Sequence, residues 1–133
     1  MVYRLFADIT VVIHSIWILF VVVGFILTVC GFWWNGFFDK WLFRTLHLCG
    51  IVYISLLGTM GKACPLTLWE NILRAKYDPT STYSGSFMIY YAEKLVYPDI
   101  NPLIIRILIT FIAVFTVVIF IINPPEKIRK IFK

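Results

Sequence analysis

Three long stretches of this chain carry no charged side chain. They run from Ile9 to Phe38, from Thr45 to Gly61 and from Ile107 to Pro125. A helix that crosses the hydrocarbon core of a bilayer needs about 20 apolar residues. A chain of 133 residues that is 61% hydrophobic and 14% charged cannot hide so much apolar surface in a small soluble fold. The sequence therefore predicts an all-α membrane protein.

The apolar stretches predict a single membrane domain with three transmembrane helices, near residues 8–32, 41–61 and 102–122. The first stretch is longer than the apolar region of a signal peptide, so we expect it to be a retained helix. Asn101-Pro102 is typical of a helix start, and Asn123-Pro124-Pro125 cannot continue a helix. A basic tail, 124–133, follows the third span.

Residues 62–101 are too polar to cross, and they predict a cap of two interfacial amphipathic helices. The first begins at Pro65, and Glu70 and Arg74 stand at the spacing of an ion pair on its polar face. Its apolar face is expected to hold Leu66, Trp69, Leu73 and Tyr77. The second helix is expected over 87–97 and closes at Tyr97-Pro98-Asp99.

The net charge of +5 is concentrated in the tail, at Lys127, Arg129, Lys130 and Lys133. Such a cluster favours the cytoplasmic side and anionic lipid head groups. The cations of the whole chain divide evenly between the two sides, so the alternative orientation stays open. Because the cations stand beside the spans, they indicate a membrane surface as the partner and not a nucleic acid.

Several stretches together resemble a family of small bacterial membrane proteins filed as domain of unknown function 2784. The resemblance covers about residues 1–122 and is most specific in "CPLTLWENILR" at 64–74. It includes Asp8 and His14 in the first span, the stretch from Arg44 to His47, and Tyr83, Ser86, Phe87, Tyr91, Tyr97 and Pro98 behind the motif. The resemblance implies a bacterial inner-membrane protein of this topology in which segment 64–98 is a designed feature, and it implies no particular activity.

Helix geometry places several polar residues at one depth. If Asp8, Gly61 and Ile104 lie at one membrane face, His14 is roughly 9 Å below that face, because a helix rises about 1.5 Å per residue. Ser55 and Thr110 then fall at the same level as His14. Polar groups inside a span are costly and are functional candidates by default.

These residues suggest a recess that binds a lipid, a quinone-like molecule or a partner subunit without catalysis. Asp8 and Arg106 would form its ionic rim, and His14 would hydrogen-bond a ligand head group. The candidate ligand-binding residues are Asp8, His14, Ser55, Cys64, Trp69, Glu70, Tyr90, Tyr91, Arg106 and Thr110, with the three aromatic residues as walls. A homo-oligomer or another membrane subunit is a plausible partner, because three spans bury little surface among themselves.

Two alternatives stay open at this point. One is a membrane enzyme in which Cys64 is the nucleophile and His14 or Glu70 the base. The other is a haem b subunit ligated by His14 and His47, although the two histidines differ in depth by roughly 12 Å on this alignment. Each residue also has a structural interpretation. His14 would bond Ser55 or Thr110, His47 a backbone carbonyl, and Glu70 Arg74, while Cys64 would begin a helix and Asp8 would pair with Arg106.

Overall fold

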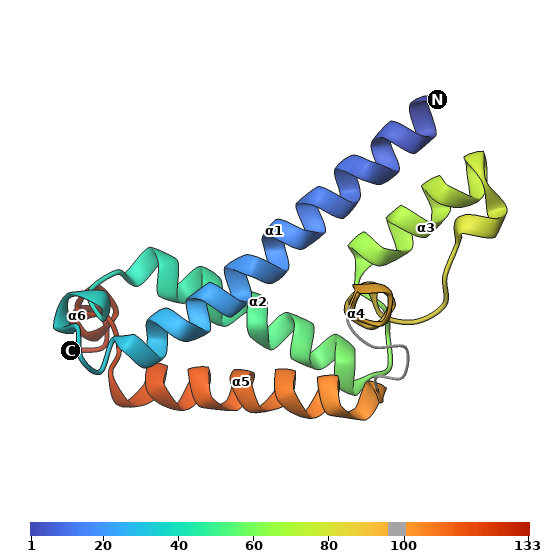
Figure 1. Ribbon diagram of the computed structural model, residues 1–133. Coiled ribbons are helices and arrows are strands. Elements are labelled where there is room, and N and C mark those ends of the chain that lie inside the picture. The colour runs from blue at the N-terminus through green and yellow to red at the C-terminus, as the bar shows by residue number, and fades with distance from the viewer. Residues whose placement is uncertain (96–100) are drawn as a thin grey trace.

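The computed structural model describes residues 1–95 and 101–133, and every regular element in this part of the chain is a helix (Figure 1). The α-helices are α1 (Val2–Cys30), α2 (Trp41–Thr59), α3 (Pro65–Tyr77), α4 (Phe87–Leu95), α5 (Pro102–Ile122) and α6 (Glu126–Ile131). Two single 3₁₀ turns, η1 (Asn35–Phe37) and η2 (Pro79–Ser81), lie in the connections.

Three of these helices, α1, α2 and α5, are long and apolar enough to cross a membrane, as the sequence predicts. The bounds of α5 are those predicted, because the Asn101 side chain accepts a hydrogen bond from the Leu103 amide at 2.9 Å and Pro102 fills the first helical position. α2 ends two residues before the predicted 61. α1 begins six residues before the predicted 8 and ends two before 32.

One narrow stripe of α1 is buried and the rest of the helix is not. The stripe follows helical spacing and consists of Ala7, Thr10, His14, Val21, Gly24 and Thr28. Thr10 and Thr28 enter it at little cost, because each hydroxyl donates to a carbonyl one turn earlier, 2.8 Å and 2.7 Å away. The outward side chains are mostly apolar, from Leu5 to Ile26. This pattern suits a helix with lipid around it.

α1 and α2 cross closely because each gives the other a glycine. A Cβ on Gly24 would overlap the His47 ring, and a Cβ on Gly50 would come within 3.0 Å of Trp17. Beside this crossing, Val21 and Ile51 join two residues of α5, Ile112 and Ala113, in the apolar core. The three long helices are therefore held together by small residues and a modest core.

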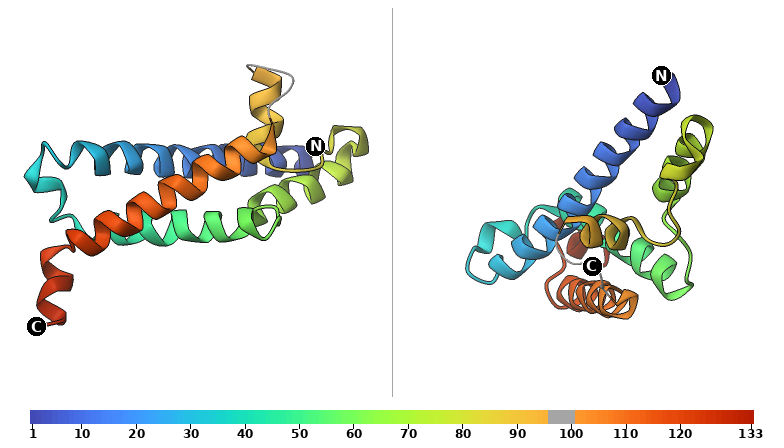
Figure 2. Two further views of the ribbon diagram at one scale, coloured as in Figure 1. Left: turned by 90° about the horizontal axis from the view of Figure 1, so that it is seen from below. Right: turned by 45° about the vertical axis from the view of Figure 1, so that its right-hand side comes forward.

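The cap lies at the end of the bundle where α2 ends and α5 begins (Figure 2). α3 runs antiparallel beside the N-terminal half of α1, while α4 stands across the bundle. Helices therefore occur at both predicted places between spans two and three. The second is described to Leu95, and its predicted end at Tyr97-Pro98-Asp99 lies outside the described residues.

The polar side of α3 is the buried side. Thr67 and Glu70 are enclosed, whereas Leu68, Trp69 and Ile72 are more than half exposed. This arrangement is the reverse of a helix packed on a soluble core, where apolar side chains turn inward. Glu70, Asn71 and Arg74 on this side find hydrogen-bond partners inside the cap, whereas the Thr67 hydroxyl has none among the described residues.

The opposite end of the bundle holds a buried cation. Arg44 is 4% exposed, donates to the Phe38 carbonyl at 3.0 Å, and lies over the rings of Phe38 and Phe120. The basic helix α6 returns to the same end, where Lys127 Nζ lies 5.2 Å from the centroid of the Trp41 ring. The two ends of the molecule therefore differ in chemistry.

Candidate ligand-binding recess

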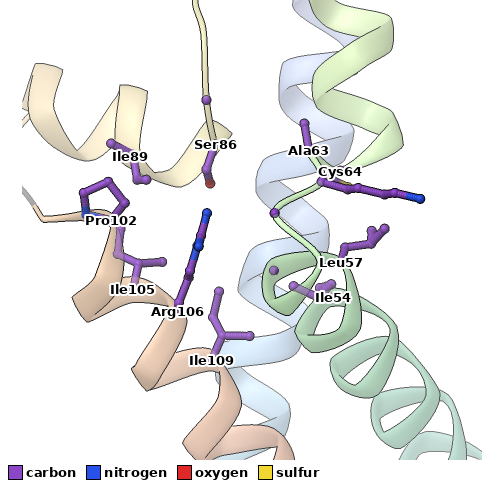
Figure 3. A pocket seen from close by; sticks show the side chains of 14 residues that line it. Ile54, Leu57, Ala63, Cys64, Ser86, Ile89, Pro102, Ile105, Arg106 and Ile109 are labelled. Atoms are coloured by element: carbon purple, nitrogen blue, oxygen red, sulfur yellow. The ribbon is translucent and has the colours of Figure 1, made fainter.

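An open hollow of about 390 Å³ lies where α2 ends, α5 begins and α4 passes over them. We call it the outer recess (Figure 3). Its walls are largely aliphatic, with Ile54 and Leu57 from α2 and Ile105 and Ile109 from α5. The two cations that line it are Lys62 and Arg106, and the Arg106 side chain rises from α5 toward Ser86.

A second hollow of about 130 Å³ adjoins the outer recess and lies deeper in the bundle; we call it the inner cavity. The two hollows share five lining residues: Ile54, Cys64, Ser86, Ile105 and Ile109. The inner cavity is otherwise lined mainly by apolar side chains, among them Trp17, Val21 and Phe87. The described residues around it include no Asp, Glu, Lys or Arg.

Two polar side chains of the inner cavity are buried without a hydrogen-bond partner. His14, on α1, is 4% exposed, and its Nδ1 has no partner among the described residues. Thr67, on α3, is 1% exposed, and its hydroxyl has none either. The His14 ring rests on Phe87, with ring centroids 4.1 Å apart. A buried polar group without a partner costs about 1–3 kcal/mol, so these two atoms require an explanation.

Glu70, unlike His14 and Thr67, has hydrogen-bond partners for both oxygens of its carboxylate. It accepts hydrogen bonds from Arg74 Nε at 2.8 Å, from the Tyr83 hydroxyl at 2.8 Å and from the Tyr91 hydroxyl at 3.2 Å. Arg74 also donates to Tyr91 at 2.8 Å, and Asn71 pairs with both backbone groups of Tyr83. We call these five residues the cap network. It ties α3 to α4 and to the loop between them.

The cap network shifts the ionisation of its tyrosines. Burial, together with the hydrogen bond to Glu70, raises the pKa of Tyr83, and burial beside Glu70 raises the pKa of Tyr91 to about 12. Both hydroxyls are therefore neutral donors at ordinary pH. Although burial opposes it, the neighbouring Tyr91 and Glu70 raise the pKa of Arg74, which stays charged.

Of the ten predicted ligand-binding residues, three line at least one of the two hollows: His14 the inner cavity, Arg106 the outer recess, and Cys64 both. Ser55 and Thr110 line neither hollow, although their neighbours Ile54 and Ile109 line both. The predicted depth of Ser55 and Thr110 along their helices is therefore close to that of the two hollows. The helix faces that line the hollows, however, carry the preceding residue in each case. His14 has no hydrogen bond to Ser55 or Thr110.

The other predicted residues lie elsewhere. Asp8 is exposed on α1, and among the described residues no ion pair joins it to Arg106, so the expected ionic rim is not formed. Trp69 is 68% exposed and lines neither hollow. Tyr90 stacks on Tyr83, and Tyr91, like Glu70, belongs to the cap network.

Sequence reasoning missed Thr67 and Ser86 as lining residues. Both stand in the stretches that carry the family resemblance, and Thr67 lies one turn before Glu70 on the polar side of α3. The signal was therefore present in the pattern of polar residues on α3. What could not be read from it was that this polar side turns inward.

The two alternative sites are not assembled by the described residues. Cys64 precedes α3 as its N-cap residue, as expected, and it has no hydrogen bond to His14 or Glu70 in this part of the chain. His47 Nε2 bonds the Val21 carbonyl at 2.9 Å, which confirms its structural interpretation. Val21 is seven residues from His14, or about 10 Å along α1, so one chain does not bring the two imidazoles together.

The chain belongs to the family described as "Protein of Unknown function (DUF2784)", whose model matches residues 4–122. The match includes both hollows and the cap network. It confirms the resemblance identified from the sequence. No curated protein and no solved structure matches the chain.

Proposed function

We propose that this protein is a non-catalytic membrane component that binds a neutral lipophilic molecule in the inner cavity. The observation that carries the proposal is the pair of buried, unpartnered polar atoms, His14 Nδ1 and Thr67 Oγ1, in an otherwise apolar cavity. Small rotations of these two side chains toward the cavity would let a ligand with a hydrogen-bonding head satisfy both atoms and offset their desolvation cost.

The dimensions of the inner cavity favour a single ring as the head group. Its volume is about 130 Å³, and an apolar protein cavity of about 150 Å³ is known to bind one benzene molecule. The absence of charged side chains among its described lining residues favours a neutral head. A six-membered ring with oxygen substituents, as in a quinone, has a suitable size, carries no charge and accepts hydrogen bonds.

In this proposal the cap lies at the membrane interface. The exposed side chains of α3, Leu68, Trp69 and Ile72, would contact lipid, while the cap network keeps its charged groups inside. The recess would then open near the lipid head groups. The protein would reside in a bacterial inner membrane, with the basic α6 on the cytoplasmic side.

Tryptophan fluorescence tests the proposal, because Trp17 lines the inner cavity and quinones quench nearby indole rings. The probe is duroquinone, titrated into the protein in lipid nanodiscs. We expect quenching that disappears in Trp17→Phe, and an affinity reduced about tenfold or more in His14→Phe and in Thr67→Val. Thr10→Val is the matched control, because that buried hydroxyl already donates to the Phe6 carbonyl.

Two results would contradict the proposal. Quenching that persists unchanged in Trp17→Phe would place the quinone elsewhere in the protein or in the lipid. Equal affinities in Thr67→Val, Thr10→Val and the parent protein would show that the unpartnered hydroxyl does not contact the ligand.

A further inference from the structure

We infer that the outer recess is a side entrance between α2 and α5, and that the ligand is a two-part amphiphile whose long apolar chain occupies this recess while its ring lies in the inner cavity. The inference rests on the proposed function and extends it from the head group to the whole molecule. It assigns a role to the larger hollow, which the head group does not fill.

The two hollows adjoin, which is the first requirement for an entrance. Five residues line both hollows, and His14 lines the inner cavity alone. Two of the five, Cys64 and Ser86, have small side chains. A ring bound at His14 therefore borders the outer recess across these two small side chains.

The wall chemistry of the outer recess suits a hydrocarbon chain. Leu57 from α2, Ile105 from α5 and Ile89 from α4 line it on three sides. The cations Lys62 and Arg106 lie at the level where α2 ends and α5 begins, which is where lipid phosphates would be. The aliphatic walls therefore favour a ligand whose hydrocarbon chain passes from the inner cavity through the outer recess into the bilayer.

The absence of a side chain at Gly58 widens the outer recess on the α2 side. This glycine lies in α2 and lines the outer recess, and a Cβ added there would meet no atom within 4 Å. Gly58 is the second-last residue of α2, where glycine is less favourable than alanine by at most about 1 kcal/mol, and no close packing explains it here. A larger side chain at this position can therefore fill the recess without displacing the protein around it.

The test compares two quinones that differ in their chains. Duroquinone carries only four methyl groups on its ring, and decylubiquinone carries a ten-carbon chain beside one methyl and two methoxy groups; both rings are fully substituted and do not add to thiols. In Gly58→Leu we expect decylubiquinone to bind about tenfold or more weakly, with duroquinone changed by less than about twofold. Gly36→Leu is the matched control, because a Cβ on Gly36 also meets nothing within 4 Å and lies at the opposite end. Ile89→Trp fills the recess from α4 and should repeat the result.

The outcomes separate this inference from the proposed function. Unchanged binding of decylubiquinone in both Gly58→Leu and Ile89→Trp would overturn the entrance. An equal loss for both quinones would also overturn it, because the recess would then belong to the head-group site. Failure of the proposed function would appear instead in His14→Phe and Thr67→Val, as unchanged binding of duroquinone.

Discussion

Glu70 shows how one residue can organise the cap. Its side chain is fully buried, and it is stabilised by Arg74 and by two tyrosine hydroxyls. Removing one member of a buried ion pair leaves the other without compensation and typically costs about 3–5 kcal/mol. We therefore expect Glu70→Ala to lower the thermal stability of the purified protein by about that amount. Glu126→Ala, an exposed glutamate on α6, should change stability by less than about 0.5 kcal/mol. Similar melting curves for the two variants would contradict the role of the network.

The same network predicts a pH dependence at the alkaline end. The folded protein raises the pKa of Tyr83 and Tyr91, the latter to about 12, mainly by burial. Because folding favours the neutral hydroxyls, their contribution to stability is complete below about pH 10 and is lost as the pH rises through about 12. Ultraviolet titration of tyrosinate checks this prediction. Tyr91→Phe should remove a late ionisation step that Tyr53→Phe, outside the network, leaves in place; its persistence in Tyr91→Phe would assign it to another tyrosine.

Alanine substitutions at two glycines of the long helices are expected to have opposite effects on stability. Gly24→Ala would place a methyl group against the His47 ring and separate α1 from α2, so we expect a lower melting temperature. Gly58→Ala meets open space and removes a glycine from the last turn of α2, so it should stabilise the protein slightly, by at most about 1 kcal/mol. Thermal unfolding of both variants in the same detergent measures the difference. Equal effects of the two substitutions would mean that the α1–α2 contact is not as close as described.

The elements themselves could be predicted because their signals are local. Asn101-Pro102 and Asn123-Pro124-Pro125 define α5, and Pro65 begins α3, whatever surrounds them. The inward side of α3 could not be predicted, because a helix among lipids can turn its polar face to the protein and its apolar face outward. The expected pairing of Asp8 with Arg106 failed for a related reason: depth along a helix follows from residue counting, but the side that faces a neighbour does not.

The described part of the chain contains three candidate spans, so the two termini are expected on opposite sides of the membrane. The basic α6 favours the cytoplasm for the C-terminus. Fusions of alkaline phosphatase and of green fluorescent protein to the C-terminus test this orientation in cells. We expect an inactive phosphatase and a fluorescent green protein; the reverse result would place the recess on the cytoplasmic side.

We propose that the bundle and its cap together form a site for a lipophilic ligand. Native mass spectrometry of the protein released from mild detergent tests that claim most directly. We predict that the parent protein carries a bound neutral lipophilic molecule and that His14→Phe, at the same expression level, releases as a bare chain. A parent protein that carries nothing, or a variant that carries the same molecule to the same extent, would contradict the account.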